Sequence, residues 1–314
     1  MMQTISEAKI KPSKWRRIFS RDRSQSIFTM VFVIPALVAY LCCFVYPIFE
    51  SFYTSFFNWN GFSDKVFVGL NNYLKILKDS VFYKAIQNDI WRVLGQEILI
   101  VPITILFAVS VTRLRLKKVE ASIYRYLFYL PNILSVSITG IVWAFIYDPY
   151  NGLLNAILKM IGLGHVIPKD GWLVQYTMPS IIVVATWAGI GYYMILLISA
   201  INSISKELYE AADVDGAGQW QQLWSITMPA VWEQVRFIVV RIIMTTLSNY
   251  TLAMLLANGG VDGSGMVMGL YVYSYGLDSL SPKVGYANAA AVILLVISSV
   301  LTLITNKFMT KEED

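Results

Sequence analysis

The chain has 314 residues, of which 56% are hydrophobic and only 14% are charged, and its mean hydropathy is +0.57. A soluble globular domain usually has about 45–50% apolar and about 25% charged residues, and its apolar residues do not fall in long blocks as they do here. The formal net charge of +5 does not indicate a nucleic-acid partner, because the lysines and arginines cluster beside these apolar blocks. The composition therefore excludes an ordinary soluble protein and a nucleic-acid binder.

Six segments are long and apolar enough to cross a membrane. A span needs about 20 mostly apolar residues, and lipid offers no partner for backbone groups, so each span is expected to be a helix. The predicted spans are 27–49, 90–112, 122–147, 173–201, 231–257 and 285–305. The sequence thus predicts an all-α polytopic membrane protein with six transmembrane helices.

The distribution of lysine and arginine predicts how these spans are oriented. With the N-terminus in the cytoplasm, the inside segments hold 14 of these residues and the outside loops hold 7, which is the asymmetry of the positive-inside rule. Both termini are then cytoplasmic. The predicted division is a basic cytoplasmic tail at 1–26, a first transmembrane helix (an uncleaved signal anchor) at 27–56, an extracytoplasmic loop at 57–87, a transmembrane core at 88–308 that includes a cytoplasmic loop at 202–230, and a cytoplasmic tail at 309–314.

Neither metal chemistry nor ATP hydrolysis is expected in this chain. The two cysteines, Cys42 and Cys43, are neighbours in an apolar stretch and are interpreted as small hydrophobic residues, and the one histidine, His165, has no other histidine or cysteine near it in sequence. The sequence contains no Gly-x-x-x-x-Gly-Lys-Ser/Thr phosphate loop and no Gly-Lys pair. We therefore expect any ATP to be bound by another polypeptide.

Ionisable residues within spans are costly and often functional. Arg236 and Arg241 follow the cytoplasmic loop closely, so we expect their side chains to extend to the inner interface. For Glu97 two interpretations stay open: it lines a solute path, or it pairs with Arg92.

The loop at 202–230 is predicted to form a compact helix–turn–helix on the cytoplasmic face. Ser205 can cap a short helix that runs to about Asp213, and Gly216 and Gly218 allow a turn. Pro229 is expected to close the segment. The second helix carries an apolar stripe at helical spacing, formed by Trp220, Leu223, Trp224 and Ile226. Such a surface suits docking to a partner, and the alternative is that the loop folds back on its own membrane helices.

The same segment resembles the EAA motif of binding-protein-dependent ABC importer permeases. That motif reads Glu-Ala-Ala, three residues, Gly, nine residues, then Ile-x-Leu-Pro. Here Glu210-Ala211-Ala212 precedes Gly216 and Ile226-Thr227-Met228-Pro229 at those spacings, with Met228 in place of leucine. The stretches FVGLNNYLKIL at 67–77, LPNILSVSITGIVWAFIYDPYNGLLNAIL at 130–158 and NYTLAMLLANGG at 249–260 are similar to the carbohydrate-uptake branch of these permeases, the maltose and glycerol-phosphate type.

The resemblance implies a type I ABC importer permease fold with cytoplasmic EAA coupling helices. It implies a multi-pass cell-membrane subunit, not an enzyme, that carries a sugar or sugar-like solute into the cell by alternating access. The implied partners are a second homologous permease forming a heterodimer, two ABC ATPase subunits, an extracytoplasmic solute-binding protein and the lipid bilayer; ATP and Mg would be bound by the ATPase, with no cofactor in this chain. The coupling residues carried over are Glu210, Ala211, Ala212, Asp213, Gly216 and Trp220.

Polar and aromatic residues on the fourth and fifth spans are candidates for the solute path, because rings cover sugar C–H faces and amides bind hydroxyl groups. The resemblance places Tyr192 and Asn249 where the maltose-type permease contacts its sugar. The alternative for each candidate is a role in packing or at the membrane interface. The candidates are Trp187, Tyr192, Tyr193, Thr245, Thr246, Ser248, Asn249 and Tyr250.

Two other classes of membrane protein are considered. An ion-coupled secondary transporter of a small solute would need carboxylates on several spans, and only Glu97 is well placed. It would also leave the EAA motif unexplained. The second class is a structural or signalling membrane protein without a transported solute, and stable co-purification with a nucleotide-binding subunit would argue against it.

Overall fold

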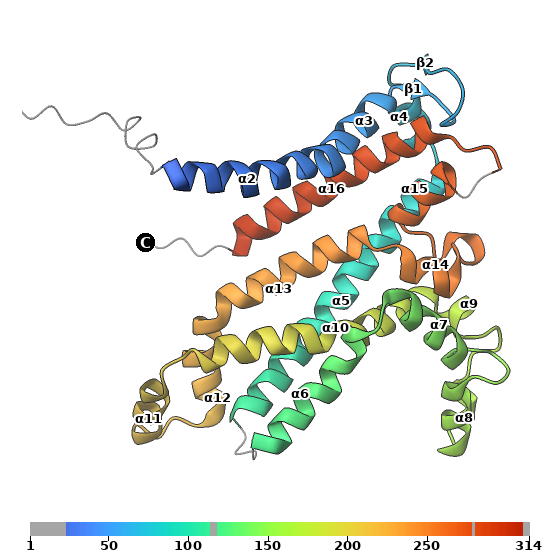
Figure 1. Cartoon of the computed structure of the whole chain (residues 1–314). Coiled ribbons are helices and arrows are strands. Elements are labelled where there is room, and N and C mark those ends of the chain that lie inside the picture. Colours follow the sequence, from blue (N-terminus) through green and yellow to red (C-terminus); the bar gives the residue numbers. More distant parts are fainter. Residues whose placement is uncertain (1–22, 114–117, 278–279, 310–314) are drawn as a thin grey trace, which may run out of the picture. The chain divides into compact units, whose positions relative to one another are not determined.

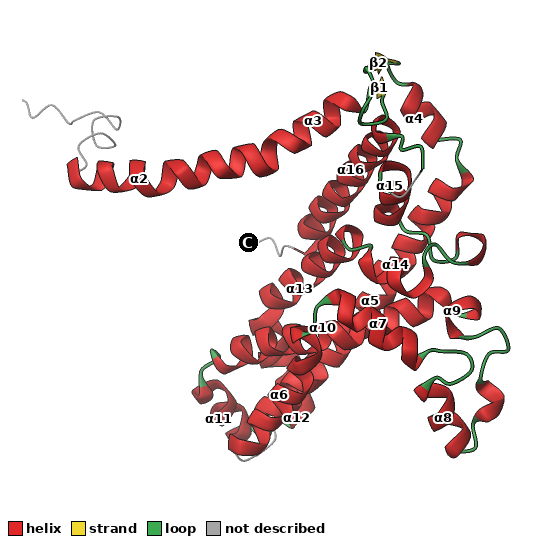
Figure 2. Ribbon diagram, turned by 45° about the vertical axis from the view of Figure 1, so that its right-hand side comes forward, coloured by secondary structure: helices red, strands yellow, loops and turns green. Residues whose placement is uncertain are grey.

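The computed structural model describes residues 23–113, 118–277 and 280–309, which form helices almost throughout (Figure 2). The predicted tails at 1–26 and 309–314 lie mostly outside these residues, as do positions 114–117 of the second basic cluster. The chain divides into two compact units, Met1–Tyr53 and Thr54–Asp314. The first unit contains α2 (Arg23–Tyr40), a π-helical turn η1 (Leu41–Val45) and most of α3 (Tyr46–Thr54).

The second unit begins with two strands and continues with helices. The strands β1 (Phe57–Asn58) and β2 (Val66–Phe67) pair antiparallel and are followed by α4 (Asn71–Ile76) and α5 (Ser80–Arg113). Next come α6 (Lys118–Ile133), α7 (Val136–Ile146), α8 (Leu153–Met160), η2 (Gly164–Val166), α9 (Trp172–Gln175) and α10 (Thr177–Asn202). The chain then forms α11 (Lys206–Val214), α12 (Gln219–Gln222), η3 (Leu223–Thr227), α13 (Met228–Ser248), α14 (Thr251–Ala257), η4 (Val261–Gly263), α15 (Met268–Gly276) and α16 (Val284–Met309).

The predicted spans correspond to four single helices and two bent pairs. The single helices are Phe28–Thr54, Ser80–Thr112, Thr177–Asn202 and Val284–Met309. Helix α5 begins at Ser80, so the segment predicted as a loop to residue 87 ends earlier. The first turns of α5 are helical because Phe82 and Ala85 are buried against Met268, Tyr271, Ala289 and Ala290.

The third and fifth predicted spans are each interrupted by a sharp bend. The pair Val119–Ile133 and Val136–Ile146 is bent by 96°, and the pair Gln219–Ser248 and Thr251–Ala257 is bent by 55°. At the first break, Pro131 lacks a backbone donor, and the Ser135 hydroxyl caps α7 by accepting from the Ile138 N–H at 3.3 Å. At the second break, Asn249 has extended backbone angles, and its side-chain oxygen accepts from the Thr251 N–H at 3.1 Å.

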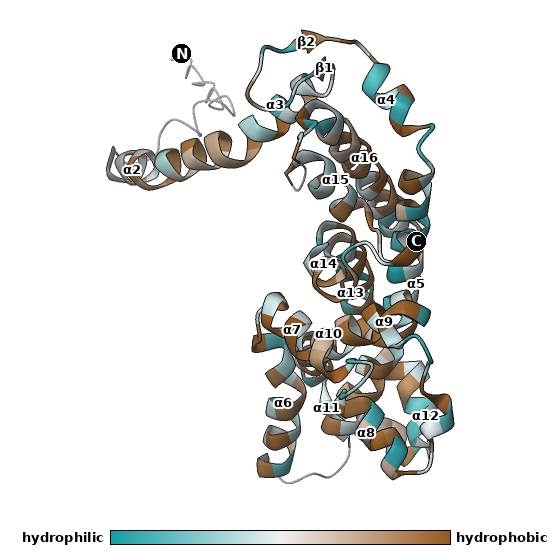
Figure 3. Ribbon diagram, turned by 90° about the vertical axis from the view of Figure 1, so that its right-hand side faces the viewer, coloured by the Kyte–Doolittle hydropathy of each residue, from teal (hydrophilic) through white to brown (hydrophobic). Residues whose placement is uncertain are grey.

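Helices α5, α10 and α13 form the main core of the second unit, with Ile100, Met194, Leu197, Ile238 and Ile242 almost fully buried. Hydrophobic residues, coloured brown in Figure 3, run along these long helices, whereas α4 carries much teal. In Figure 1 the short helices α11 and α12 lie at the lower left, at one end of α10 and α13, and β1, β2 and α4 lie at the top of the second unit. The loop at 202–230 and the segment at 57–79 are therefore at opposite ends of this unit.

At the end opposite α11, a carboxylate joins three helices. Asp79 lies just before α5, and its Oδ2 accepts hydrogen bonds from the hydroxyls of Tyr271 on α15 at 2.6 Å and Tyr286 on α16 at 3.3 Å. Burial alone would raise the pKa of Asp79, but these hydrogen bonds and those from the Val81 and Phe82 N–H groups outweigh it and lower that pKa. The ionised carboxylate thus holds the ends of α5, α15 and α16 together.

Helix α10 approaches α6 closely at one glycine. A Cβ at Gly191 would lie 2.0 Å from the backbone carbonyl oxygen of Phe128, whereas a Cβ at Gly189 would meet only ordinary contacts at 3.5 Å. Small residues at such positions let membrane helices pack backbone to backbone.

We predict that Gly191→Ala destabilises the protein by about 1–3 kcal/mol, because α6 and α10 must separate. Gly189→Ala is the matched control, and we expect it to be neutral or stabilising by up to about 1 kcal/mol through helix propensity. The measurement is the unfolding midpoint of the purified protein in detergent. Equal midpoints for the two variants would contradict the close approach.

Candidate functional site

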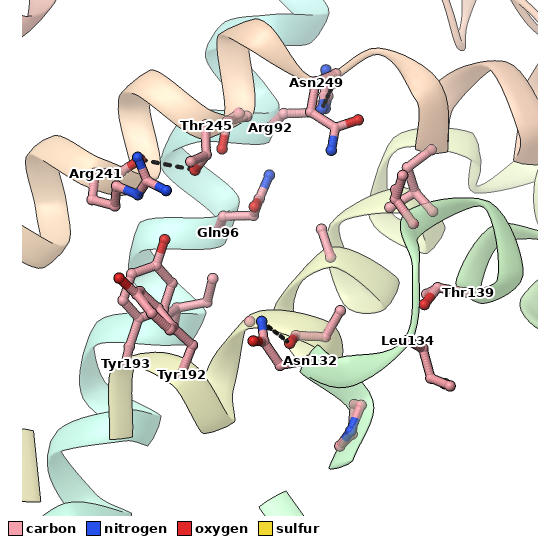
Figure 4. A pocket seen from close by; sticks show the side chains of 18 residues that line it. Arg92, Gln96, Asn132, Leu134, Thr139, Tyr192, Tyr193, Arg241, Thr245 and Asn249 are labelled. Carbon is pink, nitrogen blue, oxygen red and sulfur yellow. Dashed lines mark hydrogen bonds between the residues drawn. The ribbon is translucent and has the colours of Figure 1, made fainter. Parts of the chain in front are cut away.

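A polar cavity of about 370 Å³ lies where the two helix breaks face α5 and α10. Figure 4 shows its side chains converging from α5, from the α6–α7 break, from α10 and from α13. In membrane transporters, helices interrupted in this way expose backbone and side-chain polar groups to a solute. The lining residues are Arg92, Gln96, Ile100, Pro131, Asn132, Leu134, Val136, Thr139, Ala185, Ala188, Gly189, Tyr192, Tyr193, Arg241, Thr245, Thr246, Asn249 and Leu252.

Helix α13 presents one polar face to the cavity. Arg241, Thr245 and Asn249 follow one another at intervals of four residues, so they lie on the same side of the helix. The Thr245 hydroxyl donates to the Arg241 carbonyl at 2.8 Å, a bond internal to the helix. Asn249 ends the helix, so its amide lies at the break itself.

A buried ion pair on α5 supports the break at Asn249. Arg92 Nη1 lies 3.0 Å from Asp89 Oδ1, and both residues are only 2% exposed. Arg92 Nη2 donates to the carbonyl oxygen of Asn249 at 2.7 Å, and Asp89 Oδ2 accepts from the backbone N–H of Met268 at 2.8 Å. The pair therefore satisfies the C-terminal end of α13 and the N-terminal end of α15 together.

Several buried polar atoms at the cavity have no hydrogen-bond partner among the residues that the structure describes. These atoms are Arg92 Nε, Gln96 Nε2, Thr139 Oγ1 and Thr246 Oγ1. Buried polar groups are normally hydrogen-bonded, because a buried donor or acceptor left without a hydrogen bond costs about 1–3 kcal/mol. Their position on the cavity indicates that a polar ligand would meet them.

The structure brings together five of the eight predicted path residues: Tyr192, Tyr193, Thr245, Thr246 and Asn249. The other three do not line the cavity. Trp187 packs edge-on against Trp143 with ring centroids 5.5 Å apart, the Ser248 hydroxyl donates to the Met244 carbonyl, and Tyr250 stacks on Tyr273 at 5.4 Å.

The sequence prediction missed the polar residues contributed by other elements. Gln96 on α5 and Asn132 and Thr139 at the α6–α7 break all line the cavity. The signal available in the sequence for the break was Pro131, because proline can bend a helix. For Arg92, the signal was Asp89 three residues earlier on the same helix face.

The expectations for the intramembrane charges need correction. Arg241 lines the cavity (Figure 4). Arg236 pairs with the exposed Glu233 at 2.6 Å, and its place at the inner interface stays a prediction. Glu97 neither lines the cavity nor pairs with Arg92, because Arg92 is held by Asp89. The Glu97 Oε1 atom is buried without a hydrogen-bond partner among the described residues.

The segment at 202–230 forms the predicted helix–turn–helix. Helix α11 is capped by the Ser205 hydroxyl, which accepts from the Glu207 N–H at 3.2 Å, and Gly216 makes the turn with φ +77°. The hydroxyls of Tyr209 and Thr227 lie 2.9 Å apart, which joins α11 to the helix that follows. We call residues 205–227 the coupling segment.

The second helix of the coupling segment differs from the prediction. Pro229 does not close it: the chain stays helical from Gln219 through the π-helical turn η3 into α13, and Pro229 lies in the first turn of α13. Pro229 donates no backbone hydrogen bond within this continuous stretch, and the π-helical turn η3 directly precedes α13 at this point. The coupling segment is therefore continuous with the helix that reaches the cavity.

Most of the predicted coupling residues are accessible. Glu210, Ala211, Gly216 and Trp220 are exposed, and Ala212 is half-buried. Asp213 accepts a hydrogen bond from Gln222 Nε2 at 2.6 Å, and this bond stabilises the turn between α11 and α12. The role of these six residues in coupling to an ATPase stays a prediction.

An aromatic pair marks the outer face of the coupling segment. The rings of Trp220 and Trp224 are 5.7 Å apart and edge-on, and these residues are 72% and 54% exposed. An exposed apolar patch of this kind usually contacts a partner. The geometry favours docking over the alternative in which the whole loop folds back on its own helices.

Residues 100–310 match the sequence profile of the binding-protein-dependent transport system inner membrane components. The chain belongs to this family. It is 36% identical over 293 residues to the probable ABC transporter permease protein YurN of Bacillus subtilis, covering 91% of this chain and 98% of that protein. It is 30% identical over 297 residues to the diacetylchitobiose uptake system permease protein NgcF of Streptomyces coelicolor, covering 91% of this chain and 82% of that protein.

The fold also has a close counterpart among solved structures. A chain of a bacterial ABC transporter involved in the import of the acidic polysaccharide alginate superimposes with a TM-score of 0.79 at 23% identity, covering 96% of this chain and 99% of that chain. The predicted ABC importer permease fold is confirmed. This protein is a membrane-spanning transport subunit and not an enzyme. The alternative function, an ion-coupled secondary transporter, is rejected.

We predict that Arg92→Met destabilises the protein by about 3–5 kcal/mol, because it leaves the Asp89 carboxylate buried and unpaired. The double variant Asp89→Asn, Arg92→Met should recover part of that loss, since asparagine can still accept from the Met268 N–H. Arg236→Met is the control, because the partner Glu233 is 70% exposed in its side chain, and we expect a change within about 1 kcal/mol. Unfolding in detergent measures all three, and a double variant less stable than Arg92→Met would contradict the pairing.

Proposed function

We propose that this chain forms half of the translocation path for a sugar or sugar-like solute, with a second homologous permease as the other half. The observation that carries the proposal is the cavity at the two helix breaks, where amides, hydroxyls and tyrosine rings converge in a family of importer subunits. Sugars offer hydroxyl groups to amides and C–H faces to aromatic rings. The relative from Streptomyces coelicolor is named for diacetylchitobiose uptake, which supports a saccharide as solute.

The proposed motor is a pair of separate ABC ATPase subunits that bind ATP and Mg and dock on the coupling segment. Its exposed residues Glu210, Ala211, Gly216 and Trp220 would form the contact. Glu210 can make charge-assisted hydrogen bonds, and Ala211 permits close approach. Closure of the ATPases would then move the coupling segment and switch the spans between inward-open and outward-open states.

The proposed orientation has both termini in the cytoplasm. The asymmetry of lysine and arginine supports it. The coupling segment and the segment at 57–79 lie at opposite ends of the second unit, so a cytoplasmic coupling segment leaves 57–79 outside (Figure 1). An extracytoplasmic solute-binding protein would deliver the solute at that outer end.

We predict that Gly216→Val uncouples ATP hydrolysis from transport. Valine is strained at the φ of +77° found at Gly216, so the turn must change shape, and we expect uptake to fall at least about tenfold while hydrolysis continues. The assay uses the complete importer in proteoliposomes with ATP and with ionophores that collapse ion gradients. Wild-type uptake should survive the ionophores and require ATP.

Gly218→Val is the matched control, because Gly218 has an ordinary φ of −66° and a Cβ there meets nothing within 4 Å. We expect it to keep coupled transport. Wild-type uptake by the Gly216→Val importer would remove the coupling role of this turn.

We predict that Asn249→Ala reduces uptake at least about tenfold while the importer still assembles, because the amide at the break is lost from the cavity. Ser248→Ala is the control: the Ser248 hydroxyl is bonded to the Met244 carbonyl and does not line the cavity. Solute uptake and co-purification with the ATPase subunits are measured for both. Wild-type uptake by Asn249→Ala would take Asn249 out of the path.

A further inference from the structure

The cavity carries a cation that no described residue neutralises. Arg241 lines it beside Tyr192 and Tyr193, and its guanidinium has no ion pair within residues 23–113, 118–277 and 280–309. The second cation, Arg92, is balanced by Asp89. The described lining residues include no aspartate or glutamate. The cavity is therefore net positive.

Two further donors belong to residues in the wall of the cavity. Arg92 Nε and Gln96 Nε2 are buried donors without an acceptor among the described residues, and their side chains belong to residues only 2% and 7% exposed. They lie four residues apart on α5 and so share one face. Arg241 adds further N–H donors from α13 on the other side. A ligand that carries several oxygen acceptors would suit these donors.

An unpaired cation within a membrane span is costly, so a negative counterpart is expected. A carboxylate of the second permease could neutralise Arg241, but a single fixed carboxylate there would leave the donors on α5 unpaired. A solute with an anionic group and additional ring and hydroxyl oxygens meets both sets of donors. The amides and hydroxyls of Asn132, Thr139 and Asn249 suit its sugar hydroxyls.

We propose that the solute of this permease is an anionic saccharide, whose carboxylate or phosphate group accepts hydrogen bonds from Arg241 in the cavity. The proposal rests on the proposed sugar-transport function and narrows it to acidic sugars. Arg241 is then a specificity-determining residue, and Arg92 and Gln96 bind neighbouring oxygens of the same solute.

The test is direct binding of probes to the complete importer in nanodiscs. The solute-binding protein is left out, so that only the membrane subunits determine which probe binds. Equilibrium dialysis compares four probes: digalacturonate and its neutral counterpart galactobiose, and galactose 1-phosphate and galactose. We expect an anionic probe to bind at least about tenfold more tightly than its neutral counterpart. The carboxylate and phosphate pairs show which anionic group the site takes.

Substitutions then assign the preference to Arg241. Arg241→Gln should reduce the ratio of anionic to neutral affinity to about one, and Arg241→Lys, which keeps the charge, should retain part of it. Arg236→Gln removes an arginine from the same helix outside the cavity, and we expect the wild-type ratio.

Three results would overturn the proposal: neutral probes that bind as tightly as anionic ones, a preference unchanged by Arg241→Gln, or no binding of either anionic probe. Loss of the second permease from the Arg241→Gln complex, with no anion preference in the wild type, would also overturn it and assign Arg241 to a subunit contact. ATP-driven uptake of galactobiose would leave the proposed transport function in place and remove only the anionic solute.

Discussion

The polar end of α13 depends on one buried ion pair, because lipid supplies no hydrogen-bond partners to the backbone groups that a helix break frees. Arg92 donates to the carbonyl oxygen of Asn249 where α13 stops, and Asp89 accepts from the N–H of Met268 where α15 starts. Each charge thus lies at the helix end whose dipole it complements. Without this pair, the carbonyl oxygen of Asn249 and the N–H of Met268 would lose these hydrogen-bond partners at the break.

This arrangement also explains why charged residues are tolerated in an otherwise apolar bundle. A buried ion pair rarely adds net stability, since the cost of desolvating both groups offsets their attraction. Here the pair leaves Arg92 Nε without a hydrogen-bond partner among the described residues, and Arg92 lines the cavity with Gln96. The same side chain therefore holds the break open and offers a donor to a ligand, which links the fold to the site.

Hydropathy was sufficient to predict the spans but could not locate the breaks within them. The mean hydropathy of a window of apolar residues is the same whether the helix continues or bends by 96° at Leu134 and Ser135. Local signals did predict the coupling segment, because the Ser205 cap and the Gly216 turn depend on neighbouring residues alone. Arg241 was predicted to lie at the interface because it is close in sequence to that segment. Its position depends instead on the side of α13 on which it lies. Its spacing of four from Thr245 and eight from Asn249 places it with the predicted path residues.

The continuity of the fifth span gives the proposed mechanism a physical route. Helix α13 has 21 residues, or about 30 Å at 1.5 Å per residue, and it extends without interruption from the coupling segment to the break at Asn249. A displacement at its coupling end would shift Arg241, Thr245 and Asn249 together, because they lie on one face of the same helix. Helix α5 carries Arg92 and contacts the far end of α13 through the Asn249 carbonyl. Relative motion of these two helices would therefore change the spacing between the donors on either side of the cavity, which couples the affinity for a solute to the state of the coupling segment.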